Sequence, residues 1–192
     1  MTKIKNAKIL ILATDGFEQS ELDVPREKLK NVARLVHVAA PESRKEPKTI
    51  TGWHNHDWGN PVAVDVELSD VSESFYDALV LPGGQMNPDT LRQDALAMKL
   101  VADFLASGKV VAAICHAPWL LIEANGVRGR KMTSYSSIKT DMINAGANWV
   151  DEAVVSDQGI VTSRAPGDLD AFVAKIIEEI EEGEHQRPVL AA

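Results

Sequence analysis

Short apolar runs alternate along this chain with segments of helical periodicity, and this alternation constrains the fold more than any other feature. The runs at 8–13, 34–40, 77–81 and 110–114 have the length and composition of buried parallel strands. Strands that alternate with helices predict an α/β fold, with an open, mostly parallel central sheet and helices on both faces. Ligands in such folds bind beyond the carboxyl ends of the strands.

The remaining elements follow from apolar stripes and capping residues. Helices are expected at 21–33, at 96–105, after residue 116, at 137–145 and at 169–180. The proline in the first of these is tolerable only near the helix start, and Asp168 is the expected N-cap of the last. Residues 41–62 are predicted to form a loop or hairpin, residues 62–68 an exposed strand, and residues 150–155 and 159–162 a two-strand edge.

Composition excludes several classes of protein. The 192 residues are enough for one domain, expected over 1–192 with its core at about 8–182, and 45% hydrophobic residues suit a globular chain. The net charge of −8 makes nucleic acid an unfavourable partner. No segment is long enough to span a membrane, and the N-terminal apolar stretch is too short for a signal peptide, so we expect a cytoplasmic protein.

Cys115 is the only cysteine, so no internal disulfide is possible, and it follows directly on the apolar run 110–114. A helical segment that ends at Asn125-Gly126 comes next. The thiol is therefore predicted in a strand-to-helix turn, where free amides and the helix dipole favour a thiolate. The bland alternative is a small, inert, buried cysteine.

A thiolate alone does not make an enzyme. Lowering a thiol pKa from ~8.5 to ~6 raises the ionised fraction at pH 7 from about 3% to about 90%. Because nucleophilicity falls along with the pKa, the net gain in attack rate is only a few-fold. An oxyanion site and a proton carrier must supply the rest.

Three residues are candidates for these supporting roles. The amides of Gly84, in the turn Pro82-Gly83-Gly84, and of His116 could hold an oxyanion, although a glycine pair also suits an ordinary strand-ending turn. His116 could move the proton, but neighbouring side chains on a turn point in different directions. Asp89 could orient the histidine, or could equally be an acid at a helix start.

Glu18 and Glu21 lie just past the first strand. A protonated carboxyl there would donate a hydrogen bond to the sulfur, and an ionised one would raise the thiol pKa. From spacing alone, acids that serve a helix dipole are the simpler interpretation.

The segment Trp53-His-Asn-His-Asp-Trp58 has the look of a metal site, but it offers no fourth ligand, and exposed histidines are common in loops. We therefore expect no metal and no cofactor. The two tryptophans in a polar loop better indicate a protein interface.

Several stretches together are specific enough to indicate a family. They are Asp15-Gly-Phe-Glu-Gln-Ser-Glu-Leu22, Asp77-Ala-Leu-Val-Leu-Pro-Gly-Gly84, Ala113-Ile-Cys-His-Ala-Pro118, Gly129-Arg-Lys131, Asp141-Met-Ile-Asn-Ala-Gly146 and Ser163-Arg-Ala-Pro-Gly-Asp168. With them the chain resembles, over about 8–182, the PfpI family of intracellular proteases and general stress proteins. That family belongs to the class I glutamine amidotransferase-like superfamily, alongside the Parkinson-disease-associated deglycase.

The resemblance implies a flavodoxin-like three-layer sandwich with Cys115 as nucleophile and His116 as its base. It implies oxyanion donors at Gly84 and His116, and Glu21 as the carboxyl on the nucleophile, with Glu18 nearby. Asp89 matches an acid that relatives take from the adjacent subunit, which implies a homodimer or larger homo-oligomer. Two departures are Ala117, where the family usually has glycine, and a segment 84–89 that is one residue longer than in relatives.

Two functions follow from this reading. The first is a stress-response cysteine hydrolase that acts on a peptide or on a small carbonyl compound, as a peptidase or as a deglycase or glyoxalase. The alternative is a non-enzymatic redox-sensing or chaperone-like stress protein that acts through oxidation of Cys115. Glutamine amidotransfer is disfavoured, because we identify no synthase partner domain in the sequence.

Overall fold

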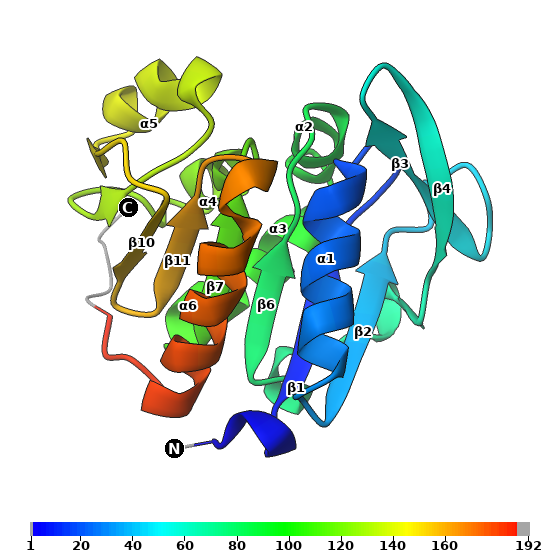
Figure 1. The fold of residues 1–192 in the computed structure, drawn as a ribbon, viewed down its shortest axis with the longest axis horizontal. Coiled ribbons are helices and arrows are strands. Elements are labelled where there is room, and N and C mark those ends of the chain that lie inside the picture. The colour runs from blue at the N-terminus through cyan, green and yellow to red at the C-terminus, as the bar shows by residue number, and fades with distance from the viewer. Residues whose placement is uncertain (1, 188–192) are drawn as a thin grey trace.

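The computed structural model describes residues 2–187, and its centre is a seven-stranded sheet in the order β10-β11-β7-β6-β1-β2-β5 (Figure 1). Every neighbouring pair is parallel except β10 and β11, which form an antiparallel edge. This confirms the predicted mostly parallel α/β sheet. The ends of the predicted domain, residues 1 and 188–192, lie outside the described residues.

The strands of the sheet are β1 (Lys8–Leu12), β2 (Leu35–Ala40), β5 (Val66–Glu67), β6 (Ala78–Leu81), β7 (Val110–Ile114), β10 (Val154–Asp157) and β11 (Ile160–Ser163). Two smaller pairs are β3 (Thr49–His54) with β4 (Asp57–Ala63), and β8 (Lys131–Met132) with β9 (Asn148–Trp149). The helices are α1 (Gln19–Lys30), α2 (Met86–Leu91), α3 (Ala95–Ser107), α4 (Pro118–Glu123), α5 (Lys139–Asn144) and α6 (Leu169–Glu182). Single 3-10 turns cover Ile4–Asn6, Leu68–Asp70, Glu73–Phe75, Ser136–Ile138 and Pro166–Asp168.

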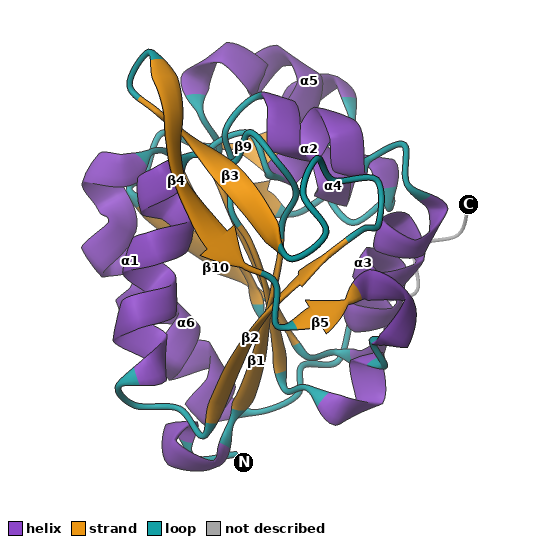
Figure 2. Cartoon of the chain, turned by 90° about the vertical axis from the view of Figure 1, so that its right-hand side faces the viewer, coloured by secondary structure: helices purple, strands orange, loops and turns teal. Residues whose placement is uncertain are grey.

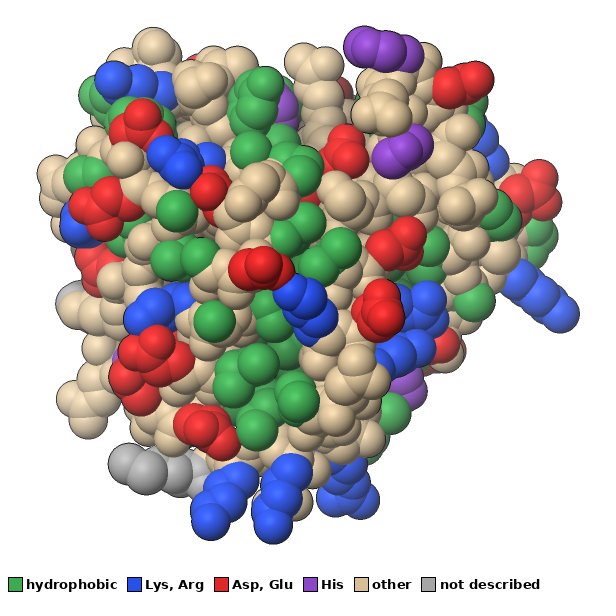
Figure 3. Space-filling model, viewed as in Figure 1, with side chains coloured by type: hydrophobic (Ala, Val, Ile, Leu, Met, Phe, Trp, Pro, Cys, Tyr) green, Lys and Arg blue, Asp and Glu red, His purple; other side chains and the backbone are tan. Residues whose placement is uncertain are grey.

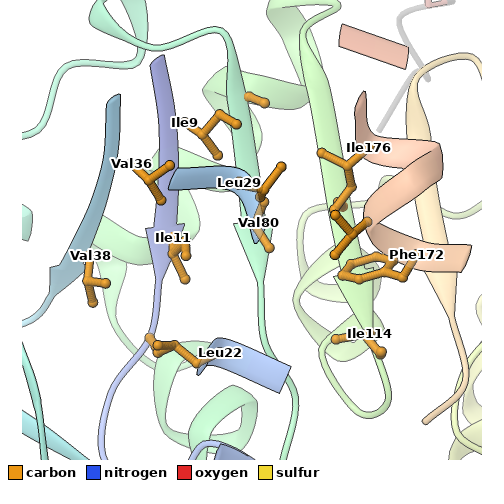
Figure 4. Packing of buried hydrophobic residues seen from close by; sticks show 14 of the residues in the cluster. Ile9, Ile11, Leu22, Leu29, Val36, Val38, Val80, Ile114, Phe172 and Ile176 are labelled. Atoms are coloured by element: carbon orange, nitrogen blue, oxygen red, sulfur yellow. The ribbon is translucent and has the colours of Figure 1, made fainter. Parts of the chain in front are cut away.

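Both faces of the sheet are covered, so its central strands are apolar on both sides. Helices α1 and α6 lie on one face and α3 and α4 on the other (Figure 2). Under α1 and α6, the strand residues Ile11 and Ile114 pack with Leu22 and Phe172 (Figure 4). Each fully buried side chain of this size contributes about 1.5–3 kcal/mol. This core fixes the sheet edge where the strands end.

The first helix differs from its prediction. It begins at Gln19 rather than at Glu21 and ends at Lys30. Pro25 therefore lies in its interior, not near its start, and cannot donate an amide hydrogen to the Glu21 carbonyl. The early start comes from the β1–α1 loop, in which the Glu18 amide donates to Gly83 and the Trp53 amide to Phe17.

The predicted N-cap of the last helix is in place but does not cap. Asp168 stands at the N-cap position of α6 without a side-chain hydrogen bond to the helix. Its carboxylate instead accepts from Arg164, at 2.8 and 3.0 Å. The Asp168 side chain, which spacing predicts to cap the helix, therefore forms an ion pair instead.

Two other segments differ in detail. Residues 41–62 contain the β3–β4 hairpin, which confirms one of the two alternatives left open for them. The edge strand expected at 150–155 begins only at Val154, because Asn148 and Trp149 pair with β8. The expected strand at 62–68 is divided between the end of β4 and the short β5.

Charge on the surface is mixed. Acidic and basic side chains are interspersed over the α1–α6 face, with hydrophobic side chains between the two helices (Figure 3). Among residues 2–187, none of the helices has the length and hydropathy needed to cross a bilayer.

Candidate active site

The three candidate loops meet because their strands are neighbours. β1, β6 and β7 are adjacent and parallel, so their carboxyl ends open at the same edge of the sheet. Glu18 and Glu21 follow β1, Gly84 follows β6, and Cys115 and His116 follow β7. The structure therefore brings these five predicted residues to one place.

Cys115 has an unusual backbone. Its φ of +64° lies in the left-handed region, which a residue with a Cβ enters only at a cost of about 1–2 kcal/mol. The turn is held because the Cys115 amide donates to the Ser163 carbonyl at 3.0 Å and its carbonyl accepts from the Tyr135 amide at 2.9 Å. Strain of this kind is typical of functional sites.

The thiol and the imidazole are in direct contact. Cys115 Sγ lies 3.1 Å from His116 Nδ1, and His116 Nε2 lies 3.0 Å from Ser137 Oγ. Tyr135 stacks on the imidazole at 4.9 Å between ring centroids, and Trp119 meets it edge-on at 5.4 Å. Burial lowers the pKa of His116, so the ring is neutral at pH 7 and can accept a proton.

Backbone amides of Gly84 and His116 face the sulfur, and both lower the pKa of the thiol. Gly84 has a φ of +76°, and a Cβ on it would come within 2.6 Å of the Glu18 nitrogen. Only glycine fits this turn. Both amides thus point to the sulfur, and donors beside a nucleophile are suited to hold an oxyanion that forms there.

Glu21 is a neutral acid rather than a helix-dipole partner. Its Oε2 accepts from the Gly83 amide at 2.9 Å, and its Oε1 is buried without a hydrogen-bond partner. Burial raises the pKa of Glu21 to about 8, and the charge of Glu18 adds to this rise. The protonated carboxyl is thus available to donate to Cys115, and the dipole interpretation is wrong for Glu21.

The surroundings of the thiol oppose the resting thiolate that the strand-to-helix turn predicts. Burial raises the pKa of the Cys115 thiol, and a charge on Glu21 would raise it further. Only 6% of the residue is exposed, and desolvation outweighs the two amides. The six-residue α4 begins at Pro118, three residues after the thiol, too short and too far along to reverse this.

Asp89 stands apart from the thiol–imidazole pair, and Glu18, although it lies at the same sheet edge, has its side-chain hydrogen bond with Ser20 rather than with the pair. Asp89 lies on α2 with its side chain exposed, and its carbonyl accepts from Gln93; the Nε2 of His116 is bonded to Ser137 instead. Glu18 makes no side-chain cap for α1, accepts from the Ser20 hydroxyl at 3.2 Å, and acts on the site through its charge.

Sequence reasoning missed Asn87, which braces the oxyanion turn. The side chain is fully buried, its Oδ1 accepts from the Thr14 amide at 2.8 Å, and its Nδ2 donates to the carbonyls of Pro82 at 2.8 Å and Gly83 at 3.2 Å. The β1 and β6 loops are thereby joined. An asparagine beside a proline after a double glycine was the available signal.

The suspected metal segment stays a surface hairpin. His54, His56 and Asp57 are exposed at the tip of β3–β4, and Trp53 contacts Trp58 edge-on at 5.5 Å. Among residues 2–187, the one group with the spacing of a metal site is Glu179, Glu182 and His185, at the end of α6. Glu179 and His185 lie 3.1 Å apart there.

Comparison with known proteins identifies the chain's relatives. The DJ-1/PfpI family profile matches residues 7–179. The chain is 42% identical to the protein named Deglycase PfpI from Pyrococcus furiosus, over 89% of this chain and 98% of that one. It is 42% identical to "Putative cysteine protease YraA" from Bacillus subtilis, over 86% and 93%. The crystal structure of Drosophila melanogaster DJ-1beta matches with a TM-score of 0.78 and 27% identity, over 92% and 95%.

Proposed function

The chain belongs to the DJ-1/PfpI family, and from this premise we propose that it is a cysteine hydrolase of the deglycase kind, which releases amines from carbonyl adducts. The observation that carries the proposal is the 3.1 Å contact between Cys115 Sγ and His116 Nδ1 beneath two convergent amides. Cys115 is the nucleophile, and His116 is its base.

Chemistry begins from the neutral pair. In an adduct of a small dicarbonyl compound, the amine stands on a hemiaminal carbon beside a ketone. The thiol proton moves to His116 Nδ1 as the sulfur bonds to the hemiaminal carbon, and the imidazolium gives that proton to the departing amine, which leaves a hemithioacetal on the sulfur. His116 then moves the hydrogen of this carbon, as a proton, to the former ketone carbon through an enediolate held by the amides of Gly84 and His116, so the hemithioacetal becomes a 2-hydroxyacyl thioester without an external oxidant. Water then adds to this thioester and restores the thiol and the acid product.

Glu21 supports the charge that develops on sulfur. A carboxyl with a pKa of about 8 is neutral at pH 7, so it adds no repulsion when the thiolate forms and can donate a hydrogen bond to it. The attack therefore needs no preformed thiolate. A thiol that ionises only during the reaction suits a high resting pKa.

The small exposed fraction of Cys115 favours a small reacting group over an extended peptide. Only 6% of the residue reaches solvent, and His116 beside it is also buried. A peptidase, the function in the name of the Bacillus relative, needs room for a chain on both sides of the scissile bond. We therefore place adducts of small dicarbonyl compounds first and peptides second.

We further propose that the active species is a homodimer or a larger homo-oligomer in which Asp89 of a neighbouring subunit approaches His116. Asp89 is exposed on α2, free to meet a second copy. Three large hydrophobic side chains near the sheet edge that carries the site are 39–41% exposed, namely Met86, Tyr135 and Trp58. Such residues are enriched at interfaces.

The redox-sensing alternative is less well supported. Oxidation to sulfenic and sulfinic acid proceeds from the thiolate, and burial disfavours the thiolate here. Redox sensing also does not require a histidine aligned on the sulfur. Mass spectrometry after graded peroxide separates the two roles, because a sensor is oxidised at low peroxide whereas the proposed hydrolase resists it.

The experiment that tests the proposal uses N-acetyl-arginine and N-acetyl-lysine treated with methylglyoxal, with lactate and free amine as the products measured. We expect the wild-type chain to release lactate and free amine in equal amounts. Cys115→Ser releases neither above the uncatalysed rate and keeps its far-UV circular dichroism. Equal product release by the two proteins would exclude the proposed chemistry, and release of peptides from casein without lactate would select the peptidase.

A further inference from the structure

We propose that Ser137 is the positioning residue of the site: its hydroxyl holds His116 by Nε2 and thereby keeps Nδ1 on the Cys115 sulfur. The inference rests on the proposed function only in giving the histidine a catalytic role. The geometry itself is the pair of contacts at 3.0 and 3.1 Å on opposite nitrogens of one ring.

The aromatic neighbours fix the plane of the imidazole but not which edge meets the sulfur. Tyr135 stacks within 26° of the ring plane, and Trp119, whose Nε1 donates to Asp141 at 2.8 Å, meets the ring edge-on at 5.4 Å. Half a turn about χ2 leaves the plane unchanged. It exchanges Nδ1 with Cδ2, so a carbon would then face Cys115.

Only hydrogen bonds distinguish the two orientations. In the observed one, both nitrogens have a partner, and in the other both Sγ and the serine Oγ face carbon atoms. Without the Ser137 hydroxyl, the bias rests on the sulfur alone, which is a weak hydrogen-bonding atom. A hydrogen bond of ordinary net strength changes such an equilibrium about two- to tenfold.

The hydroxyl also fits every protonation state of the cycle. With a neutral thiol, the S–H donates to Nδ1 and the Nε2–H donates to Ser137 Oγ. When the proton moves to Nδ1, the S–H bond breaks, the Nδ1–H bond forms, and the Nε2–H bond to the serine is kept. Ser137 is exposed, so its own hydrogen turns to solvent throughout.

The consequence concerns the single chain. If the serine aligns the histidine, the thiol–imidazole pair is formed before any neighbouring subunit arrives. The carboxylate of Asp89 from a neighbour would then add charge stabilisation to a ring that is already oriented. Thiol reactivity would then depend on Ser137, whereas turnover would depend also on Asp89 of the neighbouring subunit.

The test compares Ser137→Ala and Ser137→Thr, with Ser136→Ala on the same 3-10 turn as the matched control. Two readouts avoid any substrate: the pH profile of Cys115 alkylation by iodoacetamide, and the ring ¹⁵N chemical shifts of His116. For Ser137→Ala we expect alkylation near pH 8 to slow about two- to tenfold, and the His116 ¹⁵N shifts to move. Ser137→Thr and Ser136→Ala are expected to match the wild type.

Unchanged shifts and an unchanged pH profile in Ser137→Ala would overturn the inference. If that variant does not fold, the pair Ser137→Val and Ser137→Thr replaces it, since the two differ chiefly in the hydroxyl. An altered His116 in a protein that turns over no carbonyl adduct would leave the inference standing and refute the proposed function. Normal turnover with an unaltered His116 would refute the inference and leave the proposed function standing.

Discussion

Glu21 reaches across from α1 to hold the Gly83 amide at 2.9 Å with one carboxyl oxygen, while the other is buried without a hydrogen-bond partner in the same site as Cys115. The carboxyl thus links the turn after β6 to the nucleophile. Its neutral form satisfies both neighbours, because the protonated oxygen can donate to sulfur while the other accepts from the amide. The following predictions start from this arrangement.

The first prediction concerns stability against pH. The pKa of Glu21 is raised from an ordinary 4.5 to about 8, so the folded protein binds a proton that the unfolded chain releases. The free energy of unfolding therefore falls as the pH rises from 5 to 8, by on the order of 3 kcal/mol from this group. Glu21→Gln keeps the shape without the titration and flattens this slope in urea unfolding. An equal slope in the two proteins would contradict a raised pKa.

The second prediction concerns the thiol. Because burial raises the pKa of Cys115, its alkylation by iodoacetamide at pH 7 is slower than that of free cysteine, and the rate still rises above pH 9. Glu21→Gln lowers the midpoint of this profile, since no carboxylate then opposes the thiolate. A wild-type midpoint near 6 would restore the resting thiolate that the strand-to-helix turn suggested.

The third prediction concerns Asn87. In Asn87→Asp a carboxylate replaces the amide that donates to the carbonyls of Pro82 and Gly83. The loss of two buried hydrogen bonds and the new repulsion cost about 2 kcal/mol or more. Turnover falls with little change in KM, because the Gly84 amide is misplaced. The control is Gln85→Asp, an exposed change in the same loop, which leaves both quantities within error.

The fourth prediction concerns the shared site. Cys115→Ser and Asp89→Asn are each inactive alone if a site takes its thiol from one subunit and its acid from the next. Mixed after unfolding, they form dimers with one intact site, and random pairing recovers about a quarter of the wild-type activity. Recovery is measured at a subunit concentration above the dimer midpoint. An active Asp89→Asn protein would show that the neighbour's acid is not needed.

Local pattern predicted the sheet well, because a strand buried on both faces must be apolar throughout. The runs that became β1, β6 and β7 are buried almost end to end, and they placed Glu21, Gly84 and Cys115 at one edge. The family resemblance then gave these residues their expected roles. Neither reading depended on details of side-chain packing.

The protonation states and the supporting hydroxyl were beyond the sequence for physical reasons. The pKa of Cys115 depends on desolvation by segments distant in the chain, which outweighs the local amides. Ser137 comes 21 positions after His116 and meets it only because the chain returns over the site by way of β8. Spacing likewise predicted Asp168 as a helix N-cap, but its carboxylate accepts a hydrogen bond from Arg164 instead.

The central claim is that Cys115 forms a covalent bond with a carbonyl substrate. Intact-mass spectrometry of the protein, quenched within one turnover on methylglyoxal-treated N-acetyl-arginine, tests it most directly. The account predicts an acyl adduct that peptide mapping places on Cys115, that decays as lactate appears, and that is absent from Cys115→Ser. Substrate consumed at the wild-type rate by Cys115→Ser, with no adduct on Cys115 in the wild type, would contradict it.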